Sequence, residues 1–125
     1  MRIIDAINEA DTLKPNDFPA SIKVLWLYRL DLRLKQDIID THEYNEGEEE
    51  ITITEYSPDN TEQELLVPEP YSEIYTHWLC AQIDYYNLEY DGFNACNAMF
   101  ESVRQSYRNS YNQSHMPKGK EKNYF

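Results

Sequence analysis

Histidine and cysteine, the side chains that most often bind metals or act as nucleophiles, are few and widely spaced in this sequence. The three histidines are His42, His77 and His115, and none belongs to an H-E-x-x-H or H-x-x-E-H motif. His77 and Cys80 are three residues apart in a predicted helix, so their side chains face the same way. A zinc site would need two more ligands, and Cys96 alone does not complete it. The spacing therefore favours structural roles for these residues and predicts no bound metal.

Other catalytic patterns are also missing from the sequence. It contains no G-x-S-x-G, Walker or G-x-G-x-x-G motif, and its acidic stretch lacks the D-x-[DN]-x-[DN]-G calcium loop. Asp84 lies in the middle of a tyrosine-rich helix, where we expect a buried carboxylate held by a tyrosine or an arginine. The sequence therefore predicts neither an enzyme nor a cofactor.

The length and charge of the chain limit the kinds of protein that it can be and the partners that it can bind. Its 125 residues suit one domain, and 23 acidic against 11 basic residues give a net charge of −12. That charge argues against binding to the DNA backbone, which needs a basic face. Eleven tyrosines and two tryptophans are typical of a protein with extensive interfaces. With two cysteines, no signal peptide and no transmembrane stretch, we expect reduced thiols, synthesis in the cytoplasm and no membrane partner.

Hydrophobic periodicity predicts an all-α fold, a small bundle of about four helices. We expect these helices over residues 1–13, 19–41, 71–88 and 93–112. The third helix organises the rest, because apolar residues cover a wide part of its circumference. Asp91-Gly92 signals a break or a kink before the last helix, and the sequence leaves open which of the two occurs.

The second predicted helix is apolar on too many sides for a peripheral position. One stripe is expected to face the core: Leu25, Tyr28, Leu32 and Ile39. Beside it runs a flanking stripe: Val24, Leu27, Leu34 and Ile38. The helix is therefore either central or partly covered by another subunit, and its charged residues leave room for ion pairs across such an interface.

An acidic loop or short β-arm is predicted between the second and third helices, over about residues 43–67. Residues 43–64 carry nine acids and no lysine or arginine. The alternation of residues 51–54 predicts a short strand, and residues 64–67 would return beside it after a turn at residues 57–60. The alternative is a solvated loop, which is the usual fate of a charge run.

The helical domain is expected to span residues 1–114, followed by a flexible C-terminal tail over residues 115–125. Basic and aromatic side chains at its end are typical of a docking peptide: Lys118, Lys120, Lys122, Tyr124 and Phe125.

Three segments of the chain carry a family pattern. They read IIDAINEADTLKPN at the start, ELLVPEPYSEIYTHWLCAQIDYYNLEY in the middle, and FNACNAMFESVRQSYRNSYNQSH followed by MPK near the end. In order and length they resemble the head–tail connector proteins, also called adaptor or head-completion proteins, of long-tailed phages and prophages. The resemblance covers nearly the whole chain.

The resemblance implies a small helical bundle that assembles into a ring, typically of twelve subunits in the virion. The ring stacks beneath the portal protein, meets the next neck or stopper protein, and extends the DNA channel toward the tail. It thus implies a structural protein of the virion neck that is made in the cytoplasm of the bacterial host. DNA passes through the lumen without specific binding, and a charge of −12 agrees because an acidic wall repels phosphates.

Three sets of residues receive roles from this resemblance and from the apolar surplus. The set assigned to the core or to subunit contacts is Trp26, Leu30, Trp78 and Tyr85. The set assigned to a loop that faces the lumen or the next ring is Glu46, Glu48, Glu49 and Glu50. The tail from Lys118 to Phe125 is similar to C-terminal arms that dock onto the portal.

Two other interpretations remain open from the sequence. An acidic DNA mimic or regulatory binding protein of phage origin would occupy a basic site on another protein, and predicts a stable monomer or dimer with acids spread over one face. A different neck or tail-completion component predicts a partner other than portal.

Overall fold

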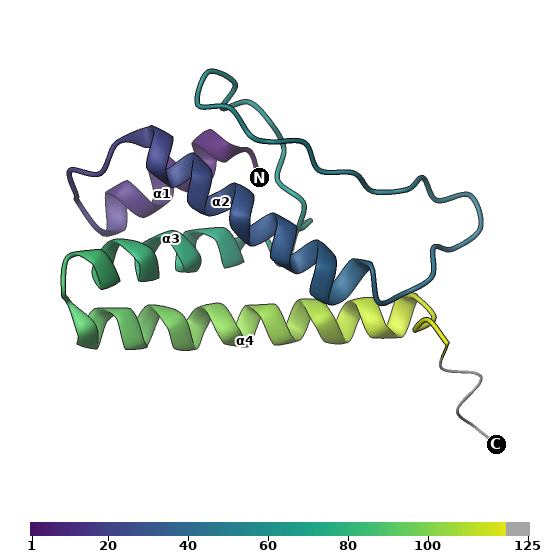
Figure 1. Ribbon diagram of the computed structural model, residues 1–125. Helices are drawn as coiled ribbons and strands as arrows, with labels where there is room; N and C mark the ends of the chain where they lie inside the picture. The colour runs from purple at the N-terminus through teal and green to yellow at the C-terminus, as the bar shows by residue number, and fades with distance from the viewer. Residues whose placement is uncertain (120–125) are drawn as a thin grey trace.

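The computed structural model of the protein describes residues 1–119, whose regular structure is entirely helical (Figure 1). The elements in chain order are α1 (Ile3–Leu13), α2 (Ala20–Leu34), the π-helical turn η1 (Lys35–Ile39), α3 (Glu73–Tyr86) and α4 (Tyr90–Ser114). Only two isolated β-bridges and no strand occur in the described residues. The predicted all-α bundle of about four helices is confirmed. Among these helices, none combines the length and the apolarity that crossing a membrane requires.

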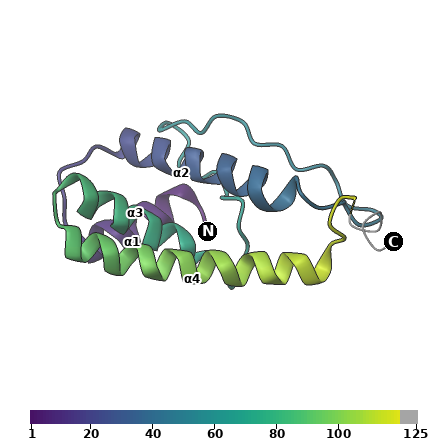
Figure 2. The same ribbon diagram turned by 60° about the horizontal axis from the view of Figure 1, so that its bottom comes forward.

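Helix α3 is the central element, because it packs against each of the other three α-helices. In both views it runs antiparallel beside the first half of α4 (Figures 1 and 2). Its buried residues point to nearly every side of the helix: Ile74, Tyr75, Thr76, Leu79, Cys80, Ala81, Ile83 and Asp84. A helix that is apolar around its axis belongs in a core, so the organising role predicted for this stretch follows from its composition.

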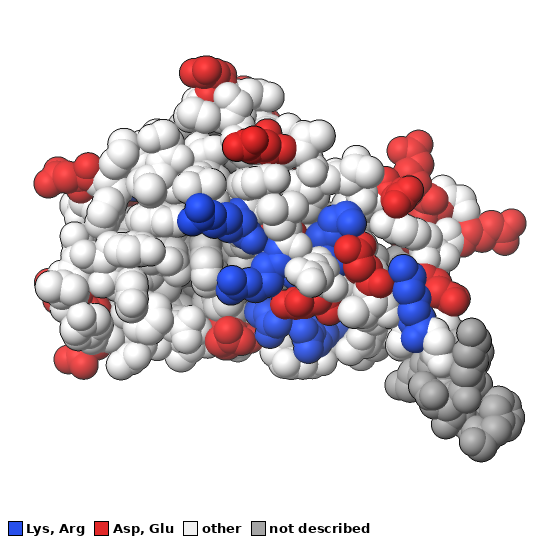
Figure 3. Space-filling view, in the orientation of Figure 1, with Lys and Arg blue, Asp and Glu red and all other residues white. Residues whose placement is uncertain are grey.

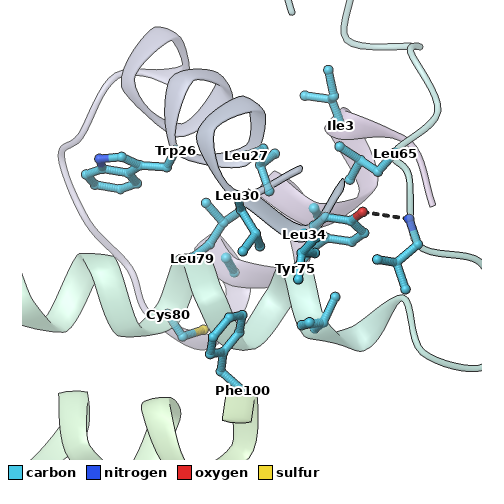
Figure 4. Packing of buried hydrophobic residues seen from close by; sticks show 14 of the residues in the cluster. Ile3, Trp26, Leu27, Leu30, Leu34, Leu65, Tyr75, Leu79, Cys80 and Phe100 are labelled. Carbon is cyan, nitrogen blue, oxygen red and sulfur yellow. Dashed lines mark hydrogen bonds between the residues drawn. The ribbon is translucent and has the colours of Figure 1, made fainter. Parts of the chain in front are cut away.

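The hydrophobic core lies where α2 and α3 face each other, with α1 and α4 closing its sides. Figure 4 shows Leu27, Leu30 and Leu34 of α2 directed toward Tyr75 and Leu79 of α3, and each of these five side chains is at most 2% exposed. Burial of one such side chain contributes about 1.5 to 3 kcal/mol. The contact between α2 and α3 therefore provides much of the stability of the domain.

The face that α2 turns to this core is not the one predicted. Of the stripe expected inside, only Ile39 is buried, and Leu32 is 39% exposed. The flanking stripe is the buried one: Val24, Leu27, Leu34 and Ile38. The two stripes are similarly apolar, and the true core face also contains the charged residues Lys23 and Asp31. Hydrophobic periodicity assigns charged residues to the solvent face, so it predicted that the stripe next to Lys23 and Asp31 was the flanking one.

The predicted β-arm is absent from the described residues. Residues 51–54 form no strand, and the partner expected for them is bonded to the N-terminus instead. The backbone N–H of Ile3 donates to the carbonyl of Gln63 at 3.0 Å, and that of Leu65 donates to Met1 at 2.9 Å. Because these backbone groups are occupied, the 43–67 segment is a loop. The turn predicted at residues 57–60 is present.

The break between the last two helices lies before the predicted position. Helix α3 ends at Tyr86 and α4 begins at Tyr90, so Gly92 lies inside the first turn of α4. A Cβ atom on Gly92 would lie 2.5 Å from the Oδ2 atom of Asp84. The glycine therefore allows the two helices to approach each other, and it does not break the chain.

We predict that Gly92→Ala destabilises the protein by about 1 to 3 kcal/mol, because the new methyl group displaces the buried Asp84 side chain. At an unhindered helical position the same change would stabilise by up to about 1 kcal/mol. Urea denaturation measures the difference. In an Asp84→Ala background the substitution should become stabilising, and destabilisation in both backgrounds would contradict the close approach.

Candidate functional site

Of the residues considered for chemistry, Cys80, Asp84 and Cys96 form a structural cluster between α3 and α4, and the three histidines lie elsewhere. The Nζ atom of Lys14 lies 3.0 Å from Oδ2 of Asp84, and the Sγ atom of Cys96 lies 3.7 Å from the same oxygen. Asp84 is therefore buried as predicted, but a lysine holds it in place of a tyrosine or an arginine. Burial, followed by the nearby Cys96, raises the pKa of the Cys80 thiol to about 12. At neutral pH this thiol is protonated and a poor nucleophile.

No group of three or more metal-ligating side chains comes together in the residues that the structure describes. The Nε2 atom of His77 lies 3.9 Å from a carboxylate oxygen of Glu73, one helical turn earlier, and this pair belongs to no larger group of possible metal ligands in the described residues.

A buried carboxylate, Asp31 of α2, fastens the long loop to the bundle. Its Oδ1 accepts a hydrogen bond from the Tyr75 hydroxyl at 2.5 Å, and its Oδ2 accepts one from the Tyr56 hydroxyl at 2.6 Å. The backbone N–H of Leu66 donates to Oδ2 at 3.1 Å. The Tyr75 hydroxyl in turn accepts from the N–H of Val67 at 2.7 Å. One carboxylate thus joins α2, α3 and the second half of the loop.

The electrostatics of Asp31 reflect this fully buried position. Burial raises the pKa of its carboxyl group, while the hydrogen bonds from Tyr56, Tyr75 and Leu66 favour the charged form. Burial and the adjacent Asp31 raise the pKa of both phenols, so both tyrosines remain protonated donors at neutral pH. The network therefore matches one acceptor group with three donors.

The predicted acidic-loop residues lie in the first half of the loop. We call residues 46–50 the acidic segment, which contains Glu46, Glu48, Glu49 and Glu50, all exposed. Glu48 alone is bonded in the described structure: its carboxylate accepts from the backbone N–H of Asn45 at 2.6 Å and lies 2.9 Å from Nε2 of His115. The hydrogen bond from Asn45, followed by the one with His115, lowers the pKa of Glu48. The other three carboxylates face solvent.

The predicted tail begins with residues that are bonded to the domain. The N–H of Glu43 donates to the carbonyl of Met116 at 2.7 Å, and the N–H of Lys118 donates to Thr41 at 2.9 Å. The His115 ring stacks on Tyr111 with the ring centroids 3.9 Å apart. The remaining residues predicted to dock on portal lie outside the described residues: Lys120, Lys122, Tyr124 and Phe125.

The four predicted packing residues lie at different depths. Leu30 belongs to the core, and Trp26 is 6% exposed. Trp78 is half-buried, and its Nε1–H donates to the carbonyl of Trp26 at 3.2 Å. Tyr85 is 48% exposed, and its ring makes an edge contact with the ring of Tyr86, which in turn stacks on Trp26. The set therefore runs from the core to the surface and does not form one site.

Tyr85 belongs to an exposed apolar surface where α3 turns into α4. We call this surface the hydrophobic turn: Tyr85, Tyr86, Leu88 and Tyr90, which are 48%, 55%, 69% and 56% exposed. The four side chains lie within six residues of the chain. Large side chains gathered in this way favour a protein partner over solvent.

Leu88 ends α3 in a backbone conformation that favours glycine. Its N–H donates to Tyr85, and the N–H of Glu89 donates to Asp84, which together form a Schellman motif. The φ angle of Leu88 is 60°, in the left-handed region, where an L-residue other than glycine loses roughly 1–2 kcal/mol. Leucine is thus unfavourable here both for its backbone and for its exposed side chain.

A third surface, which sequence reasoning missed, is a groove between α2 and the α3–α4 pair. Two hollows of about 270 and 190 Å³ meet there and share Leu30, Arg33 and Trp78. Arg29 lines one hollow and Arg104 the other. In Figure 3, blue Lys and Arg side chains gather in the middle of the face, while many red acidic ones lie at its edges. We call this surface the arginine groove.

No family model, curated protein or solved structure matches this chain. The resemblance to head–tail connectors therefore stays a prediction.

The role of Asp31 was also missed, although the sequence contains a signal for it. Asp31 lies four residues after Leu27 and three before Leu34, at the spacing of the buried stripe. A single acid in register with a core stripe indicates a buried acceptor when tyrosines are available elsewhere in the chain.

We predict that Asp31→Ala lowers the free energy of unfolding by about 3 kcal/mol, because the buried Tyr75 hydroxyl and two half-buried donors, on Tyr56 and Leu66, lose their acceptor. Urea denaturation measures this change. Asp17→Ala is the control: it also removes one negative charge, but Asp17 is exposed and has no hydrogen bond or ion pair within the described residues. Equal losses in the two variants would contradict the network.

Proposed function

We propose that this protein is a structural subunit of the phage neck: a head–tail connector that forms a ring beneath the portal. It joins capsid to tail, extends the DNA channel and catalyses no reaction. The observation that carries this proposal is Leu88, an exposed leucine in a left-handed backbone conformation. The sequence resemblance to connectors supplies the identity of the assembly.

Leu88 supports an assembly role because the isolated molecule gains nothing from it. Glycine or asparagine would suit its φ angle better, and a polar side chain would suit its exposure better. A residue that is unfavourable in the free molecule indicates a contact that it makes only when the protein is assembled with a partner. Tyr85, Tyr86 and Tyr90 beside it provide the rigid amphipathic side chains that interfaces favour.

The charge of the protein suits a channel through which DNA passes. A net charge of −12 repels the phosphate backbone, and the acidic segment presents exposed carboxylates on a loop at one end of α4 (Figure 1). A ring wall built from subunits of this net charge would reduce adhesion of passing DNA.

The test is the molar mass of the protein by size-exclusion chromatography with light scattering, alone and mixed with the portal protein. A connector forms a ring alone or on portal. A monomer or dimer that never joins portal, and instead binds a basic host or phage protein, would favour the acidic mimic and contradict the proposal.

We predict that Leu88→Asn separates stability from assembly. Asparagine tolerates the left-handed conformation, so the free energy of unfolding should rise by about 0.5–1 kcal/mol. Ring formation or portal binding should weaken at the same time. Met99→Asn is the control, since Met99 is 51% exposed on α4 and lies nine residues beyond Tyr90. Unchanged assembly of the Leu88 variant would remove the hydrophobic turn from the interface.

A second prediction concerns the tail. Deleting residues 120–125 leaves the backbone hydrogen bonds of Met116 and Lys118 in place, so thermal stability should not change. Binding to portal should weaken, because the deletion removes two lysines and the two terminal aromatic residues. Pull-down on immobilised portal measures this, and normal binding by the shortened chain would exclude portal docking by the tail.

A further inference from the structure

We propose that the arginine groove accepts the acidic segment of a second copy of the chain. The contact would join two different surfaces, so it is heterologous, and contacts of this kind close into rings when the rotation between copies allows it. The inference rests on the proposed ring and names the residues through which neighbouring copies recognise each other.

The groove contains unused positive charge. Within the described residues, neither Arg29 nor Arg33 makes an ion pair or a hydrogen bond, although acids outnumber bases 23 to 11 in the chain. Both are exposed and lie one turn apart on α2. Arg104 faces them from α4 and is partly neutralised, with Asp37 at 3.5 Å and Glu101 at 3.6 Å.

The floor of the groove suits a peptide that carries carboxylates. Trp78 and Phe100 line it, with their ring centroids 4.9 Å apart. These rings lie beside Arg104, whose side chain is only 21% exposed, so a carboxylate next to Arg104 would be attracted more strongly than one in open water. Arginine also binds carboxylates through two parallel hydrogen bonds. The site is therefore built for an acidic peptide more than for an apolar one.

The acidic segment has the matching properties. It carries four carboxylates in five residues; those of Glu46 and Glu49 have no partner in the described structure, and that of Glu50 interacts only electrostatically, with Lys35. In extended form five residues span about 17 Å. That length exceeds the roughly 6 Å of helix rise between Arg29 and Arg33, so the segment can meet both arginines and still extend toward Arg104.

A single copy does not bring its own acidic segment into its own groove. Asp31, which holds the second half of the loop, lies two residues from Arg29 and two from Arg33. Two residues correspond to about 200° around the helix, so Asp31 lies on the opposite side of α2 from the arginines. The first half is fixed to the far end of α4, where the Asn45 side chain donates to the Ser114 carbonyl at 2.9 Å. The occupant must therefore come from another molecule.

Nucleic acid is the other polyanion that arginines attract. A phosphate chain that crossed this groove would also run past Asp37, Glu101 and the acidic edges of the same face (Figure 3). A short acidic loop can be held by Arg29 and Arg33 alone, at a distance from those acids, whereas a longer phosphate chain must also pass them, so the observations favour the second copy. Binding of DNA is retained as an outcome of the test.

The test uses the intact protein and a synthetic peptide of residues 43–54, with binding followed by calorimetry. We expect binding to the native chain and at least tenfold weaker binding to the Arg29→Glu, Arg33→Glu variant. A peptide with Glu46→Lys and Glu49→Lys should show the opposite preference. Absent binding, equal binding to both proteins, or tighter binding of a twelve-nucleotide DNA strand would overturn the assignment.

The same changes in full-length chains separate this inference from the proposed function. The groove variant and the loop variant should each fail to form rings alone, and their mixture should form rings, because each supplies the surface that the other needs. A Glu9→Lys, Asp17→Lys chain matches the loop variant in charge and should assemble normally. If the groove variant forms rings without the loop variant, the proposed contact is wrong but the ring is not contradicted. If the peptide binds the native chain but no ring forms, the groove does accept the acidic segment and the proposed ring is wrong.

Discussion

The buried carboxylate of Asp31 is the constraint on which the arrangement of this molecule depends. A carboxylate without water is costly unless donors surround it, and here Tyr56, Tyr75 and Leu66 must all be in place together. Those donors come from the loop and from α3, so satisfying one group fixes both relative to α2. The long segment before α3 thus gains a defined position without forming a strand.

This fastening divides the 43–67 loop into two parts with different properties. Its second half is bonded to Asp31 and to the N-terminus, whereas its first half is attached mainly at the end of α4 and keeps its carboxylates exposed. The arginine groove and the hydrophobic turn are likewise left open by a bundle whose core is already complete. The proposed ring would pair the arginine groove with the acidic segment of the next copy, and the assembly would cover the hydrophobic turn.

Much of the fold was predictable, because apolar spacing alone identifies the four helices and the central role of residues 71–88. What periodicity does not contain is the choice between two equally apolar stripes on α2, which depended on Asp31 and Lys23 being buried. The strand expected at residues 51–54 failed for a similar reason, since its partner backbone pairs with residues 1–4. Gly92 was misassigned because its close approach to Asp84 arises only when the chain turns back between α3 and α4. The arginine groove was missed because its residues come from three helices.

The central claim is that the hydrophobic turn is exposed in one copy and covered in the assembly. Hydroxyl-radical footprinting, read residue by residue in a mass spectrometer, tests it on the lone chain and on its complex with portal. The account predicts strong oxidation of Tyr85, Tyr86 and Tyr90 in the lone chain and protection in the complex, with the buried Tyr75 unreactive in both. Equal oxidation of the three exposed tyrosines in both samples would contradict it.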